Sequence, residues 1–272
     1  MSPPARDDDS ERRLVDRLRG ARPRFHVHAY LSLTSTQDQA RELVRGGAPH
    51  GTVVIARAQT RGRGRLGSSW ISAPELGLYL SVALRPKRPP VELPPLSLVA
   101  AVAAAEALSQ ACGVKVELKW PNDLLLRRRK LGGILGELEL NPDGPAAVVL
   151  GIGINLNQQA RDFAPELRRR AISVRRATGR TCDRIELAAS LLQALGSRYR
   201  EWEARGLPPA LRRFRRLSPM LRGARVRVDT GKEMFSGVTH GLDRDGRLIV
   251  ALGDRRLVHL HAAEVHLLPA IS

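Results

Sequence analysis

One glycine-rich segment and the residues that follow it restrict the possible fold most. The segment is Gly62-Arg63-Gly64-Arg65-Leu66-Gly67, and it comes shortly after a strand-like run, Thr52 to Gln59. Its glycines match G-x-G-x-x-G, but a dinucleotide-binding turn must open a helix and have an acidic residue about 20 positions on. Here Ser68-Ser69-Trp70-Ile71-Ser72-Ala73-Pro74 follows, which is no helix start. A kinase glycine loop is excluded as well, because no H-R-D or D-F-G element follows. We therefore predict a loop between strands, outside any Rossmann or kinase fold.

Two functions remain open for this loop from its residues alone. Glycines let the backbone wrap closely around a ligand, and arginines supply fork-shaped donors for carboxylate or phosphate. An Arg-Gly segment that binds RNA is usually repetitive and disordered. This segment is a single copy between strands and is closed by Trp70. The pattern favours a loop that folds over a small anionic ligand.

The charge balance suggests nucleic acid at first. The 272 residues hold 45 basic and 27 acidic side chains, a net charge of +18, and only five of the basic residues are lysines. Most of the excess lies in arginine runs such as 161–180, which are typical of a solvated surface. A nucleic-acid-binding regulator is kept as an alternative from a different class.

Composition also restricts the compartment. The longest apolar stretch, Leu96 to Ala105, is too short to span a bilayer, and the N-terminus lacks the layout of a secretory signal. Cys112 and Cys182 form neither a metal pattern nor a disulfide framework, and we expect both to be buried bystanders. His259 and His261 are expected to be structural. We predict a cytoplasmic protein with no membrane partner.

The chain reads as a larger mixed domain followed by a small barrel. Strands are predicted at 52–59, 77–85, 114–120, 133–140 and 146–157, and helices at 95–112 and from Asp183 to about Arg205. After Pro219, short β-like runs alternate with turns such as Asp245-Gly246, the pattern of a β-barrel. We predict an N-terminal extension over 1–30, a catalytic domain over 31–217 and a barrel over 218–272.

Two further motifs carry chemistry. Lys119-Trp120-Pro121-Asn122-Asp123-Leu124 ends a strand with a cation, an amide and a carboxylate together, and Lys130-Leu131-Gly132-Gly133-Ile134 follows. Gly151-Ile152-Gly153-Ile154-Asn155 is a strand whose glycines leave room for a flat ligand. Each motif alone is ordinary turn or bulge chemistry. Their combination in this order is far more specific.

Together with Ser35-Thr36-Gln37 and Gln59-Thr60, these motifs resemble the biotin protein ligase family over about Leu31 to Leu268. The resemblance implies an α+β fold: a mixed-sheet catalytic domain of the biotin/lipoate ligase type, then a small SH3-like β-barrel. It implies that biotin and ATP, with Mg²⁺, give biotinyl-5′-AMP, and that the biotinyl group is then transferred to a lysine of a biotin carboxyl carrier protein or domain. It also implies a monomer or homodimer that binds no DNA, since about 30 residues precede the catalytic domain and a DNA-binding module needs roughly 60.

The resemblance assigns roles by position. Biotin and the anionic centre would be held by Ser35, Thr36, Gln37, Gln59, Gly62, Arg63, Gly64 and Arg65, over a floor of Gly133 and Gly151. Lys130 would meet the biotin carboxylate and the phosphate, and Trp70 would stack on adenine. The ATP and magnesium side would be served by Asn122, Asp123 and Asn155, with Asp123 as the metal-linked carboxylate and Lys119 structural or phosphate-facing. The catalytic set would be Lys130, Arg65, Arg63 and Asp123.

The sequence departs from the family pattern at a few positions. Ser68 stands where many relatives carry a cation, Arg61 replaces a small residue, and Leu268 replaces a cation that often follows the barrel position matched by Glu264. A lipoate or octanoate ligase of the same fold is the nearer enzymatic alternative, and its octanoyl transfer can use a nucleophilic cysteine. Neither cysteine here lies within a motif.

Overall fold

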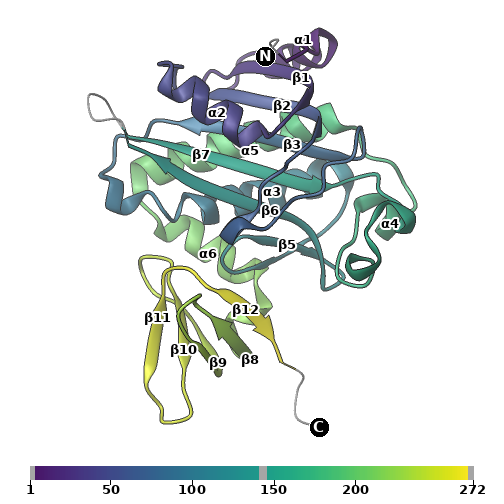
Figure 1. The fold of residues 1–272 in the computed structure, drawn as a ribbon. Coiled ribbons are helices and arrows are strands. Elements are labelled where there is room, and N and C mark those ends of the chain that lie inside the picture. The colour runs from purple at the N-terminus through teal and green to yellow at the C-terminus, as the bar shows by residue number, and fades with distance from the viewer. Residues whose placement is uncertain (1–3, 141–145, 269–272) are drawn as a thin grey trace.

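Two β-sheets in sequence organise the molecule in the computed structural model, which describes residues 4–140 and 146–268 (Figure 1). The first is a mixed seven-stranded sheet in the order β1-β2-β3-β7-β6-β5-β4, in which only β1 and β2 pair in parallel. Its strands are β1 (His26–Leu33), β2 (Thr52–Gln59), β3 (Gly77–Leu84), β4 (Glu117–Lys119), β5 (Asp123–Leu126), β6 (Arg129–Glu139) and β7 (Ala147–Asn155).

The second sheet is antiparallel throughout and has the order β11-β10-β9-β8-β12. Its strands are β8 (Arg222–Asp229), β9 (Met234–Leu242), β10 (Leu248–Ala251), β11 (Leu257–Leu260) and β12 (Glu264–Leu267). The predicted class, a mixed-sheet domain followed by a small β domain, is confirmed. Trp120 joins the two parts, because its buried indole Nε1 donates to the Gly246 carbonyl at 3.0 Å.

The helices divide unequally between the two faces of the large sheet. They are α1 (Asp8–Arg17), α2 (Thr36–Arg45), α3 (Leu96–Cys112), α4 (Val174–Thr178), α5 (Arg184–Arg205) and α6 (Pro208–Leu217). Alternate residues of β7 separate the faces: Val148 and Leu150 pack in the large core with α3 and α5, whereas Val149 packs with α2 in a smaller cluster. α2 contacts β2, β3 and β7, and its Arg41 and Arg45 form ion pairs with Glu139 on β6.

Local sequence signals set most helix ends. Gly113 ends α3 in the left-handed conformation (φ 66°), and Asp183 caps α5 by accepting from the backbone N–H groups of Ile185 and Glu186. The helix predicted from Asp183 to about Arg205 forms as α5. Gly206, at φ 70°, ends α5, and Pro208 starts the separate helix α6. Among the described residues, no helix is long and apolar enough to cross a bilayer.

The N-terminal residues are part of the large sheet. β1 begins at His26, within the segment predicted as an extension, and runs parallel to β2. Asp7 is the N-cap residue of α1 and ties this helix to the domain. Its buried carboxylate accepts two hydrogen bonds from Arg57, both at 2.6 Å. Burial opposes ionisation, but the hydrogen bonds from Arg57 and Ser10 outweigh it and lower the pKa of Asp7 to about 2.

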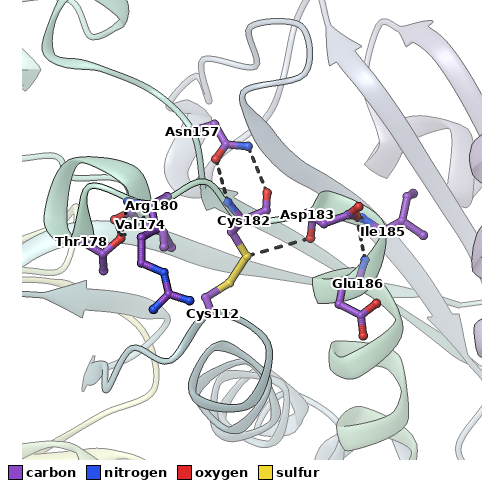
Figure 2. The surroundings of a disulfide bond; sticks show 9 residues. All are labelled: Cys112, Asn157, Val174, Thr178, Arg180, Cys182, Asp183, Ile185 and Glu186. Atoms are coloured by element: carbon purple, nitrogen blue, oxygen red, sulfur yellow. Dashed lines mark hydrogen bonds between the residues drawn. A yellow bond between two sulfur atoms is a disulfide. The ribbon is translucent and has the colours of Figure 1, made fainter.

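Cys112 and Cys182 form a disulfide, so the prediction of two bystander thiols was wrong (Figure 2). Cys112 is the last residue of α3 and Cys182 lies just before α5, which places their Cα atoms 5.9 Å apart across 70 residues of sequence. Asn157 fixes the second cysteine by bonding both its backbone N–H and its carbonyl at 3.1 Å. The bond joins the two helices that form most of one face.

Replacing both cysteines by serine should lower the thermal unfolding midpoint by about 6 to 12 °C. A disulfide across a loop this long contributes about 3 kcal/mol, mainly by restricting the unfolded chain. Circular dichroism melts of wild type and variant, each with and without reductant, measure the effect. Reductant should lower the midpoint of the wild type alone. Equal midpoints for the oxidised wild type and the variant would contradict a stabilising role.

Candidate active site

A row of residues on one face of the large sheet forms the base of the site. The strand register pairs Lys119 with Asp123, Asp123 with Gly133, Gly133 with Gly153 and Gly153 with Tyr79. Residues paired in this way point to the same face of a sheet. Charged groups therefore stand at the β4–β5 end of the row, next to a floor that has no side chains.

Lys130 joins this row because the β5–β6 pairing contains a bulge. The register shifts between Leu124 and Leu125, so Lys130 pairs with Leu125 and shares the face of Asp123. Its Nζ lies 2.7 Å from Asp123 Oδ1, while Lys119 Nζ lies 3.9 Å from Oδ2. One carboxylate thus holds two lysines. The structure brings together Lys119, Asp123 and Lys130 as the motifs predicted.

Charge from the second sheet also reaches this cluster. Burial lowers the pKa of the Lys119 ammonium. The carboxylates of Asp123 and of Glu264 on β12 oppose this shift, and the neighbouring charge of Lys130 adds to it. Burial likewise lowers the pKa of Arg65, against the carboxylates of Asp123 and Glu264. Glu264 thus acts on both cations through its charge; among the described residues, its ion pair is with His266.

The glycine–arginine loop is folded on itself over the sheet. The Trp70 N–H donates to the Gly62 carbonyl at 2.8 Å, and the Gly64 N–H donates to the Ser68 carbonyl at 2.7 Å. A Cβ at Gly62 would lie 2.4 Å from the Trp70 carbonyl oxygen, and one at Gly64 would lie 2.5 Å from Ser68 Oγ. Gly62 requires glycine because the loop's own backbone passes so close, whereas at Gly64 the nearest atom belongs to the Ser68 side chain and the nearest backbone oxygen lies at 3.2 Å.

Arg65 and Trp70 connect the loop to the other motifs. Arg65 donates to Asn122 Oδ1 at 3.2 Å, and the Asn122 amide donates in turn to the Ile134 carbonyl at 2.8 Å. The Trp70 ring occupies the space above Gly153, where a Cβ would lie 2.6 Å from it. Lys130 Nζ lies 6.0 Å from the ring centroid. Gly153 is thus a site residue that the sequence reasoning quoted but did not assign.

The polar residues at the start of α2 form the opposite wall. Ser35 caps the helix, Thr36 Oγ1 donates to Gln59 Oε1 at 3.0 Å, and the Gln37 amide donates to the Val149 carbonyl at 3.1 Å. All three α2 side chains are buried. A Cβ at Gly151 would lie 2.5 Å from Gln37 Oε1, so this glycine makes room for the amide. The predicted group of Ser35, Thr36, Gln37, Gln59 and Gly151 is assembled in the structure.

Two predicted ligand residues have protein partners instead. Arg63 is paired with Asp38 at 2.6 Å and with Glu137 at 2.7 Å, neither of which the sequence reasoning singled out. Asn155 is buried at the end of β7, where its amide donates to the Ile172 carbonyl and its oxygen accepts from Gln158. Glu137 could have been found from the alternation along β6, which places it on the face of Gly133.

Comparison with known proteins identifies the relatives of this site. Residues 30–155 match the biotin/lipoate A/B protein ligase family. The bifunctional ligase/repressor BirA of Bacillus subtilis is 36% identical over 89% of this chain and 74% of its own length. The biotin–[acetyl-CoA-carboxylase] ligase of Mycobacterium tuberculosis is 33% identical over 94% of this chain and 95% of its own.

A solved structure agrees in fold as well. The biotin protein ligase from Aquifex aeolicus, in complex with biotin and ATP, superimposes with a TM-score of 0.77 at 29% identity, covering 90% of this chain and 99% of that one. The motif residues described above fall within the matched family region, from the start of α2 to Asn155. The shared motifs, the long matches and the common fold show that the chain belongs to the biotin protein ligases of the biotin/lipoate A/B family.

Proposed function

We propose that this protein activates biotin with ATP and transfers it to a lysine of a biotin carboxyl carrier domain. In the first step a biotin carboxylate oxygen bonds to the α-phosphorus, and the bond from that phosphorus to the β-phosphate bridging oxygen breaks, releasing pyrophosphate. In the second step the neutral carrier amine attacks the acyl carbon, AMP leaves and the amine loses a proton. The observation that carries the proposal is the pair Lys130–Asp123 beside the glycine–arginine loop and a glycine floor.

Positive charge is what the first step requires of the protein. Two anions, the carboxylate and the triphosphate, must meet, and charge shifts onto the pyrophosphate oxygens as the bond breaks. Lys130 and Arg65 supply that charge from two different elements, β6 and the loop. Asp123 holds the Lys130 ammonium at 2.7 Å and so orients it. Neither step uses a protein nucleophile, in keeping with two cysteines joined as a disulfide.

The floor and the loop explain selectivity and protection. Gly133 presents backbone only, which suits a flat ring lying on the sheet, whereas the space above its row neighbour Gly153 is taken by the Trp70 ring. Trp70 already packs on Gly153, so its indole stands where it would stack on a nucleobase. A loop folded over the acyl-adenylate would keep water from the mixed anhydride.

Magnesium would enter with the triphosphate. Asp123, the carboxylate predicted to bind it, is engaged by two lysines, which makes this carboxylate a poor fit for a metal ligand. Over 4–140 and 146–268, no three His, Cys, Asp or Glu side chains gather as a metal cage. Mg²⁺ retains waters and binds through substrate phosphates when no cage is present. We assign it no protein ligand.

The carrier domain of a biotin-dependent carboxylase is the proposed acceptor, and the cytoplasm, where ATP and such carboxylases meet, is the proposed compartment. In a reducing cytoplasm Cys112 and Cys182 would be thiols, because disulfides are rare there, so the state of this pair in cells bears directly on the compartment. Alkylation of intact cells followed by mass mapping of Cys112 and Cys182 tests this part of the proposal.

We propose no DNA partner, and the chain would act as a monomer or a homodimer.

The purified protein should catalyse exchange of labelled pyrophosphate into ATP when biotin is added. Exchange is the reverse of adenylate formation, so it requires the correct acid but no acceptor. Lipoate serves as the matched control acid. Exchange with lipoate and none with biotin would contradict the proposal in favour of the related lipoate chemistry. Mass spectrometry of an added carrier domain then tests for one biotinylated lysine.

A further inference from the structure

Arg63 is held by two carboxylates that come from different elements. Its Nη1 donates to Asp38 Oδ1 in the first turn of α2 at 2.6 Å, and its Nη2 donates to Glu137 Oε1 on β6 at 2.7 Å. Burial alone would lower the pKa of this guanidinium, but the two carboxylates outweigh burial and raise it. The charge of Arg63 is thus balanced within the protein and is not free for a phosphate.

Glu137 has a second contact that Asp38 lacks. Its Oε2 accepts from Gln37 Nε2 at 3.0 Å, while the Gln37 oxygen accepts from Ser81 Oγ at 3.1 Å. An ionised carboxylate accepts hydrogen bonds only, so it directs the NH₂ end of the amide toward itself, together with the Val149 carbonyl, which accepts from the same Nε2 at 3.1 Å. The amide oxygen is consequently turned toward Ser81 and the space left by Gly151.

We propose that Glu137 is a positioning residue that links two parts of the biotin site: it clamps the glycine–arginine loop through Arg63 and sets the orientation of the Gln37 amide. Asp38 assists with the loop alone. Arg63 then acts as the loop's anchor to the sheet, and the ligand-facing charge of the loop is carried by Arg65. The assignment to biotin rests on the proposed function, whereas the clamp itself rests on the ion pairs.

β6 offers a matched control for the clamp. Glu139 lies two residues beyond Glu137 on the same face, is similarly shielded, and pairs with Arg41 and Arg45 of α2. Arg41 is shared between the two carboxylates, since its Nη1 also lies 3.8 Å from Glu137 Oε2. The structure gives it no contact with the loop among the described residues. Glu137→Gln, Asp38→Asn and Glu139→Gln each remove one carboxylate charge with little change in size.

Limited trypsin digestion of the whole protein tests the clamp without any substrate. Cleavage after Arg61, Arg63 or Arg65 requires the loop to open, so its rate follows the open population. Glu137→Gln and Asp38→Asn should each raise cleavage there about tenfold or more, since each removes a charge-assisted hydrogen bond. Glu139→Gln should cleave like wild type. Equal cleavage in Glu137→Gln and wild type would overturn the clamp.

The kinetic arm separates the two roles of Glu137. In biotin-dependent exchange, Glu137→Gln should raise the KM for biotin at least severalfold more than Asp38→Asn does, because only Glu137 also orients Gln37. Equal KM values for biotin in these two variants would overturn the role of Glu137 in orienting the amide. The clamp would then be decided by the trypsin digestion alone. If wild type shows no exchange with biotin, the proposed function fails and the digestion result still decides the clamp. Thermal melts verify that each variant is folded.

Discussion

Lys130→Met is expected to lower the rate of biotin-dependent pyrophosphate exchange about a thousandfold while the protein stays folded. Losing one fixed charge at a centre where charge develops typically costs 10²- to 10³-fold in rate, and Lys130 is placed beside that centre by a bulge in β6 and by Asp123. The fold should survive because the side chain is 43% exposed and its backbone bonds to Arg170 and Ile172 remain.

The measurement is initial-rate exchange at saturating biotin and ATP, with a melting curve for each protein. Lys232→Met is the matched control, since this exposed lysine lies in the turn between β8 and β9 of the second sheet. The control should keep wild-type rates. If Lys130→Met also keeps them, Lys130 does not touch the reacting atoms.

Arg65→Ala should reduce the same exchange about a hundredfold or more. This arginine is the loop's link to Asn122, at 3.2 Å, and burial holds it in a setting where its charge acts strongly. Arg65→Lys should recover little of the loss, because an ammonium cannot reproduce a planar fork that meets two oxygens at once.

Exchange assays on both variants, with Arg169→Ala as the control, measure the effect. Arg169 is exposed and lies outside the motifs, so its loss should leave the rate unchanged. Full rescue by lysine would show that only charge matters at this position. Wild-type rates in Arg65→Ala would remove it from the site, and the charge supplied by the loop would then have to come from elsewhere.

Local patterns predicted the elements that carry the site. The runs predicted as strands at 52–59 and 77–85 became β2 and β3 almost residue for residue, and the motifs became β4 to β7. The strand β1 was not predicted, because its histidines and polar neighbours obscure the apolar pattern. Its residues form a strand because they pair with β2. The strand β12 was missed as well.

The site residues were predictable as a set but not in their partnerships. Lys119, Asp123 and Lys130 are close in sequence, so short-range geometry brings them together. Arg63 meets Glu137 across 74 residues, and no local pattern states which carboxylate lies opposite an arginine. The sequence predicts a metal role for Asp123, whereas the structure pairs this carboxylate with two lysines.

The sequence by itself determined the motifs of the family: a glycine–arginine loop, a lysine–carboxylate motif and a glycine-bearing strand in a fixed order. It also determined where helices begin and end, because capping and helix-breaking residues act locally. Tertiary structure alone decided that Cys112 and Cys182 are bonded and that Arg63 is anchored by Asp38 and Glu137. The physical reason is the same in each case. These contacts join residues far apart in sequence, so they depend on how the sheets and helices pack, which local propensity does not encode.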